Sequence, residues 1–131
     1  MSGENVEMLE RIYEELFGGR TLGADLLAED VEWVNPPDAV ERGVRRGIDS
    51  FNDAIRSVFQ AWEEARFETE RVFDQGDDVV ALGQVRGLGR GAGIEVVRPH
   101  GEIWTFRDGR AVRMRWFNSH SETLEAAGLW E

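Results

Sequence analysis

The sequence predicts an α+β protein in which helices pack on one face of a curved sheet. The segments with helical periodicity come first, and several extended segments follow one another in the second half. Near Ala65 the apolar pattern changes from a period of 3.6 residues to a period of two. Asp108-Gly109 between two alternating runs is a strong hairpin signal. With 131 residues and no linker, the chain is expected to form one domain over residues 1–131.

Four segments are predicted to be helical. In the first, apolar residues recur every three or four positions, Ser2 is the expected N-cap, and Gly18-Gly19 ends the helix. A short second helix is expected next. The third begins near Asp49 or Ser50 and carries an apolar stripe, and a short helix comes last. In chain order, the predicted helices cover residues 6–17, 22–28, 49–65 and 121–127.

Alternating apolar and polar residues predict the strands. The first covers residues 29–35 and is ended by Pro36-Pro37, and a loop is expected from there through Gly43 and Gly47. The glycines between 87 and 93 indicate a loose connection or a bulged strand end, because no helix start follows as a phosphate loop would require. After the third helix, the extended segments are 67–73, 79–86, 94–97, 102–107 and 111–118.

The composition excludes several classes of function. The chain has 26 acidic residues against 15 basic ones, all Arg, so its net charge of −11 would repel nucleic acid and anionic lipid surfaces. It has no Cys, and its two His residues show no metal-ligand spacing, so neither a metal nor another cofactor is expected. Without a long apolar run or a basic N-terminus, the expected location is the cytoplasm.

Five motifs resemble those of SnoaL-like proteins, which belong to the nuclear-transport-factor-2-like superfamily. The similarity extends from Val6 to Leu129 and implies a cone-shaped, cystatin-like roll, in which a bent mixed sheet wraps around the N-terminal helices and encloses an apolar pocket. It also implies a homodimer through the outer face of the sheet. The motifs are residues 30–33 (DVEW), 47–51 (GIDSF), 76–82 (GDDVVAL), 104–110 (WTFRDGR) and 115–117 (RWF).

Strand alternation sorts the residues that could line such a pocket. Glu102 and Trp104 share one face of their strand, and Arg113, Arg115 and Phe117 face the opposite way from Met114 and could form the dimer interface. Large aromatic walls suit a flat or hydrophobic ligand. The expected substrate-binding residues are Trp33, Asn35, Phe59, Trp62, Trp104, Met114, Trp116 and Asn118.

The expected catalytic residues are Tyr13, His100 and Glu102. The resemblance extends to ketosteroid isomerase, in which a Tyr on the first helix and a protonated acid on a late strand stabilise an oxyanion, and Tyr13 and Glu102 occupy the matching positions. Asn35 stands where that enzyme has its base. His100 is in phase with Glu102, so the two could form a base–acid couple. Burial is expected to keep Glu102 protonated.

Three functions stay open at this point. The first is binding of a hydrophobic small molecule, with cyclisation, isomerisation or dehydration by proton transfer. The second is a non-catalytic ligand-binding or interaction module, which Asn35 in place of a base favours. The third is epoxide or ester hydrolysis, which requires an Asp–Arg pair inside the pocket. The second histidine, His120, is expected to cap the last helix or to lie at the pocket mouth.

Overall fold

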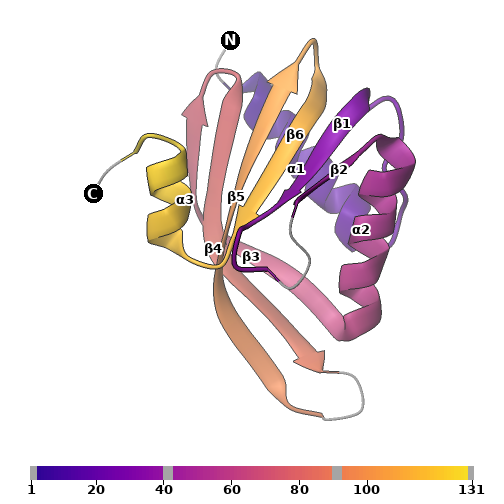
Figure 1. The fold of residues 1–131 in the computed structure, drawn as a ribbon, viewed down its shortest axis with the longest axis vertical. Helices are drawn as coiled ribbons and strands as arrows, with labels where there is room; N and C mark the ends of the chain where they lie inside the picture. Colours follow the sequence, from indigo (N-terminus) through magenta and orange to yellow (C-terminus); the bar gives the residue numbers. More distant parts are fainter. Residues whose placement is uncertain (1–2, 40–42, 90–92, 130–131) are drawn as a thin grey trace.

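A computed structural model describes residues 3–39, 43–89 and 93–129, which form a six-stranded sheet with helices on both of its faces (Figure 1). The helices are α1 (Glu4–Phe17), α2 (Ile48–Ala61) and α3 (His120–Ala126). The strands are β1 (Leu27–Asn35), β2 (Gly43–Arg46), β3 (Trp62–Gln75), β4 (Asp78–Gly89), β5 (Glu95–Arg107) and β6 (Arg110–Phe117). None of the helices in these ranges is long and apolar enough to cross a membrane.

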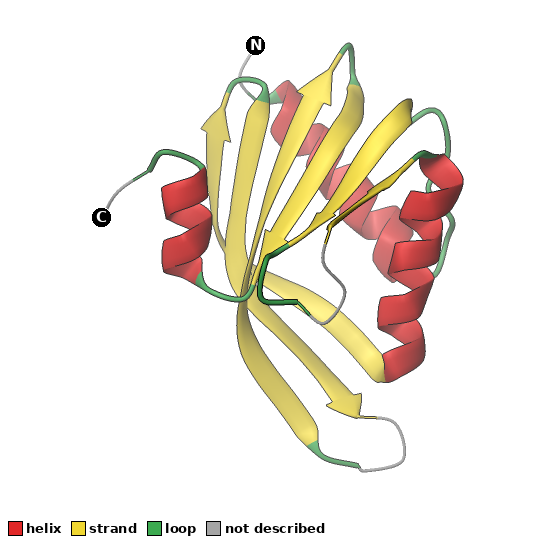
Figure 2. Ribbon diagram, viewed as in Figure 1, coloured by secondary structure: helices red, strands yellow, loops and turns green. Residues whose placement is uncertain are grey.

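The sheet is mixed and strongly bent. Its strand order is β2-β1-β6-β5-β4-β3, and all neighbouring pairs are antiparallel except β1 and β6, which are parallel. Helices α1 and α2 lie on one side of the sheet and α3 lies on the other, as Figure 2 shows. The α+β architecture predicted from the order of the segments is therefore confirmed, but the expectation that the helices share one face is wrong for α3, because Leu124 packs on the second core.

Alternation along the strands creates two apolar cores. On β4, Val79 packs into the larger core under α1 and α2, whereas its neighbour Val80 packs into the smaller core under Leu124 of α3. Successive side chains of a strand point to opposite faces, so one strand serves both cores. The larger core contains Ile12, Leu22, Leu26, Leu27, Val31, Phe51, Ile55, Val79, Ala81, Trp104, Phe106, Ala111 and Met114, among others.

Two elements differ from the predictions. The expected helix over 22–28 does not form: a turn in which the N–H groups of Leu26 and Leu27 both bond to the oxygen of Gly23 leads directly into β1. Leu27 then pairs with Ala111 of β6, so the end of the segment expected to be helical is part of the sheet. The expected loop before α2 contains β2, a four-residue edge strand with too few residues to show a period.

The two extended segments expected at 94–97 and 102–107 are one strand. β5 is continuous because it pairs with β4 over its length, from Glu95 opposite Leu88 to Thr105 opposite Asp78. The glycine-rich segment expected as a loose connection or a bulged strand end is part of β4 as far as Gly89, and residues 90–92 lie outside the described residues. Ser2, the expected N-cap of the first helix, also lies outside them.

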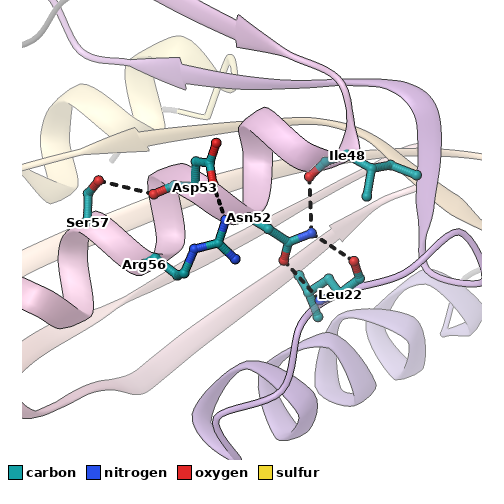
Figure 3. Close-up of polar contacts among 6 residues, drawn as sticks. All are labelled: Leu22, Ile48, Asn52, Asp53, Arg56 and Ser57. Carbon is teal, nitrogen blue, oxygen red and sulfur yellow. Dashed lines mark hydrogen bonds and ion pairs between the residues drawn. The ribbon is translucent and has the colours of Figure 1, made fainter.

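Asn52 fixes α2 to the segment that follows α1, and the contacts are drawn in Figure 3. The residue is 5% exposed. The amide oxygen accepts from the N–H of Leu22 at 2.9 Å, and the amide nitrogen donates to the oxygens of Leu22 at 2.9 Å and Ile48 at 3.0 Å. Both backbone groups of Leu22 are thus satisfied in the interior by one side chain.

We predict that Asn52→Leu destabilises the fold by about 2–4 kcal/mol, because it keeps the volume and leaves the buried N–H and C=O of Leu22 without a partner. Chemical denaturation followed by tryptophan fluorescence measures the change. Ser57→Ala is the matched control, because its hydroxyl bonds to the oxygen of Asp53 on the exposed side of the same helix (Figure 3), and it should change stability by less than about 0.5 kcal/mol. Equal midpoints for Asn52→Leu and wild type would show that this contact is unimportant.

Candidate functional site

A cavity of about 240 Å³ lies between the inner face of the sheet, α2 and the end of α1. Most of its wall is aromatic or aliphatic, and its polar side chains include His100 and Glu102. Seven of the eight predicted substrate-binding residues line it, namely Trp33, Phe59, Trp62, Trp104, Met114, Trp116 and Asn118. Asn35 does not. Sequence reasoning missed other lining residues, including Leu16, Phe17, Ile55, Val58, Phe67, Val85 and Arg98.

Asn35 lies behind the wall and holds two of its indoles. Its amide oxygen accepts from Nε1 of Trp33 at 2.8 Å and from Nε1 of Trp116 at 2.8 Å. Because Trp Nε1 is a donor that needs a partner when buried, Asn35 lets both rings line the cavity without an unsatisfied N–H group. The residue that was expected to contact substrate therefore orients two residues that line the cavity.

Glu102 gathers three donors onto one carboxylate. Oε1 accepts from the hydroxyl of Tyr13 at 2.6 Å and from Nε1 of Trp104 at 2.8 Å, and Oε2 lies 2.8 Å from Nε2 of His100. The side chains of Glu102 and His100 are each 13% exposed. Tyr13 comes from α1 and the other three residues from β5, so this cluster joins the first helix to the sheet.

The expected protonated state of Glu102 is corrected by these contacts. Burial raises the pKa of a carboxyl group, but the hydrogen bond and charge of His100, together with the hydrogen bonds from Tyr13 and Trp104, outweigh burial and lower the pKa of Glu102 below its usual value. Glu102 is therefore an ionised acceptor at neutral pH. The proposed role of a neutral acid that donates a proton does not fit this environment.

Tyr13 supports Glu102 and does not face the cavity. Its ring packs edge-on against Phe67 and Trp104, and its hydroxyl donates a hydrogen bond to Glu102. Burial, followed by the negative charge of Glu102 and the hydrogen bond to it, raises the pKa of Tyr13 well above its usual value. Tyr13 is not among the described residues that line the cavity, so the structure brings it to Glu102 and away from the position expected of an oxyanion donor.

His100 faces the cavity, as its phase with Glu102 predicted. Its ring stacks on Trp116 with a centroid distance of 5.9 Å and meets Phe67 edge-on at 4.9 Å. Gly101 between the two polar residues points to the other face, where a Cβ atom would lie 2.0 Å from the hydroxyl oxygen of Thr123 in α3. The close approach of α3 therefore requires a glycine here and keeps β5 regular, so that His100 and Glu102 share the inner face.

The other predicted residues lie outside the cavity. His120 is the first residue of α3 and its Nε2 lies 2.7 Å from the oxygen of Gly83, while Ser119 caps the helix. Arg113 and Arg115 point to the outer face, and the Nε atom of each is buried without a hydrogen-bond partner among the described residues. The homodimer expected through this face involves a second chain and stays a prediction.

Within the described ranges, no group of three potential metal ligands occurs.

We predict that Tyr13, the one tyrosine of the chain, ionises in the folded protein only well above pH 10. A raised pKa means that the fold favours the neutral phenol, so this contribution to stability is present below the unfolded pKa and is lost as pH rises through the folded value. Tyrosinate absorbance during alkaline titration measures the ionisation, and Glu102→Gln should lower the midpoint because it removes the nearby negative charge.

Glu14→Gln is the control for this titration, since it removes an exposed carboxylate from the next position of α1 and should leave the midpoint unchanged. Ionisation of Tyr13 near its ordinary value in folded wild-type protein, or the same midpoint in Glu102→Gln, would contradict the contact with Glu102.

Solved structures with the same fold include proteins of several kinds. A protein of unknown function from Burkholderia pseudomallei, described as similar to nuclear transport factor 2, is 24% identical, with 94% of this chain and 96% of that chain covered and a TM-score of 0.78. A candidate SnoaL-like polyketide cyclase from Jannaschia is 20% identical, with 95% and 92% covered and a TM-score of 0.78. TerC, co-crystallised with polyporic acid, is 24% identical, with 94% and 97% covered and a TM-score of 0.77.

These similarities show the fold, which the chain shares with a polyketide cyclase candidate and with a protein described as having a ketosteroid isomerase-like fold. No curated protein matches the sequence. The model of the SnoaL-like domain family matches residues 10–114, which include Tyr13, His100 and Glu102. The chain therefore belongs to the SnoaL-like domain family.

Proposed function

We propose that this protein binds a flat, hydrophobic small molecule in the cavity and moves a proton at one of its carbon atoms, with His100 as the general base. The observation that carries the proposal is the His100–Glu102 contact of 2.8 Å inside an otherwise mostly apolar wall. A water-poor site strengthens the interaction between an ionised carboxylate and an imidazole. Such a pair is a common arrangement for acid–base chemistry.

In this proposal, each nitrogen of the imidazole has a role. In the neutral imidazole that a general base requires, Nε2 would donate its proton to the carboxylate of Glu102, and Nδ1 would accept the proton from substrate; the charged imidazolium that lowers the pKa of Glu102 is the form after this transfer. The carboxylate then stabilises the imidazolium that forms. Tyr13 and Trp104 hold the carboxylate from its other oxygen, so they act as positioning residues for His100 through Glu102.

Cyclisation, isomerisation and dehydration all begin or end with such a proton transfer at carbon, so the site fits each of them. The Jannaschia protein is described as a polyketide cyclase candidate, and TerC was co-crystallised with polyporic acid. Both descriptions support a cavity that binds small organic molecules. The volume of about 240 Å³ suits a ligand of about two fused rings. Stacked and edge-on aromatic side chains favour flat molecules.

The two alternatives have less support. A hydrolase that activates water with an Asp–Arg pair needs an aspartate in the cavity, and no Asp belongs to the described lining. A purely binding module requires no acid–base pair, and burying His100 against Glu102 would then serve packing alone. Asn35 favoured the binding module because it replaces a base. Its side chain accepts hydrogen bonds from two indoles, and this structural role is compatible with either function.

We predict that the wild-type protein accelerates exchange of the acidic C–H protons of 2-tetralone with deuterium from solvent, followed by NMR. This flat ketone is the probe, because its exchange requires only a base next to carbon. His100→Gln should slow the catalysed exchange by roughly 10²–10⁴-fold, the usual contribution of a positioned general base. Glu102→Gln should slow it too, since it removes the charge that stabilises the imidazolium.

His120→Gln is the matched control, since it changes the other histidine, which bonds to Gly83 outside the cavity, and it should leave exchange at the wild-type rate. Melting temperatures of all variants separate loss of the base from loss of the fold. Binding of 2-tetralone without exchange above the rate in buffer would favour the non-catalytic module and refute the assignment of His100.

A further inference from the structure

Along the inner face of β5, exposure increases from the apolar Trp104, through Glu102 and His100, to the cationic Arg98. Trp104 is 1% exposed, the side chains of Glu102 and His100 are each 13% exposed, and Arg98 is exposed. All four line the cavity. Because residues two apart on a strand share a face, Arg98 follows His100 toward solvent and lies at the mouth of the same cavity.

Arg98 is held against the cavity wall. It lies opposite Val85 on β4, and Val85 lies opposite Phe67 on β3, so the three share one face of the sheet and all line the cavity. The guanidinium carbon of Arg98 is 6.0 Å from the centre of the Trp62 ring, which also lines the cavity. A cation over an indole face is attracted to the ring and keeps its N–H donors directed outward from the ring edge.

Within the described part of the chain, the charge of Arg98 is not neutralised by an ion pair. Among the side chains that the structure describes, no carboxylate forms an ion pair with it, although acidic residues outnumber basic ones by 26 to 15. Arginines elsewhere do find partners: Arg46 pairs with Glu32, and Arg86 pairs with Glu68 and Glu95. The cavity lining therefore holds a guanidinium, that of Arg98, for which the described side chains supply no carboxylate partner; a second arginine, Arg66, also belongs to the lining.

We propose that the ligand is an anion: a flat, hydrophobic molecule that carries a carboxylate or a similarly acidic oxygen group, which binds Arg98. This inference rests on the proposed function of the cavity and names its ligand class. Arginine recognises carboxylates through paired N–H donors, which gives both affinity and orientation. The net charge of −11 repels anions from the rest of the surface, so a local cation is the feature that would admit one.

The strand also sets the orientation of the ligand. Residues two apart lie roughly 7 Å apart along a strand, so the acidic group at Arg98 would lie at about that distance from the carbon that faces His100. This separation is close to the span of a fused two-ring system with one acidic substituent. The ligand would enter with its apolar rings toward Trp104 and leave its acidic group at the mouth.

Two naphthalenes of nearly equal shape test the inference. Binding of 2-naphthoate, which is an anion, and of 2-naphthamide, which is neutral, is measured by quenching of tryptophan fluorescence and by calorimetry. We expect wild type to bind the naphthoate about 10-fold to 100-fold more tightly than the amide. Arg98→Gln should remove this preference by weakening naphthoate binding while leaving amide binding unchanged.

Arg107→Gln is the matched control, because it removes the same charge from an exposed position at the other end of β5. It should keep the wild-type preference. Equal weakening of naphthoate binding by both substitutions would overturn the inference, since net charge and not the site would be responsible. Equal binding of the two molecules by wild type would overturn it too, while leaving the apolar cavity and the proposed function intact. Binding of neither molecule would refute both.

Discussion

The buried carboxylate of Glu102 is the interaction on which the rest of the site depends. An ionised carboxylate away from water is costly unless donors replace the lost hydration, and here three side chains do so. Those donors fix the ring of His100, the hydroxyl of Tyr13 and the indole of Trp104 at once. Because the fold lowers the pKa of Glu102, this network stabilises the protein above the unfolded pKa of a glutamate and loses that effect as pH falls through the lower folded value.

A second oxygen, on the neighbouring strands of the same sheet, accepts indole N–H groups in the same way. The amide of Asn35 takes the N–H groups of Trp33 and Trp116, as Oε1 of Glu102 takes that of Trp104. Three indoles can therefore present apolar rings to the cavity while their polar edges are bonded behind it. The result is a largely apolar cavity in which the imidazole of His100 has defined neighbours, Phe67 and Trp116, and one carboxylate partner among the described residues.

Local pattern predicted the direction of these side chains but not their partners. The period of a strand is two whatever the surroundings, so Glu102 and Trp104 could be assigned to the inner face from the sequence. The Tyr13–Glu102 hydrogen bond joins positions 89 residues apart, and no local signal indicates it. The predicted protonated state of Glu102 is wrong for the same reason. The sequence pattern indicates burial, whereas the three donors that outweigh burial come from the folded arrangement. The strand β2 and the turn that replaces the helix over 22–28 likewise depend on pairing with other strands: Val44 lies opposite Val34, and Leu27 lies opposite Ala111.

The state of the Glu102 carboxyl group tests this account most directly. In protein carrying ¹³C at glutamate side-chain carboxyls, the resonance of Glu102, assigned with Glu102→Gln, is followed by NMR as pH is lowered. The account predicts a carboxylate signal that persists at and below the usual glutamate pKa of about 4.5 and changes only at lower pH. A signal that titrates above this value, or that is protonated at neutral pH, would show a neutral acid in the cavity and would contradict the network described for Tyr13, His100 and Trp104.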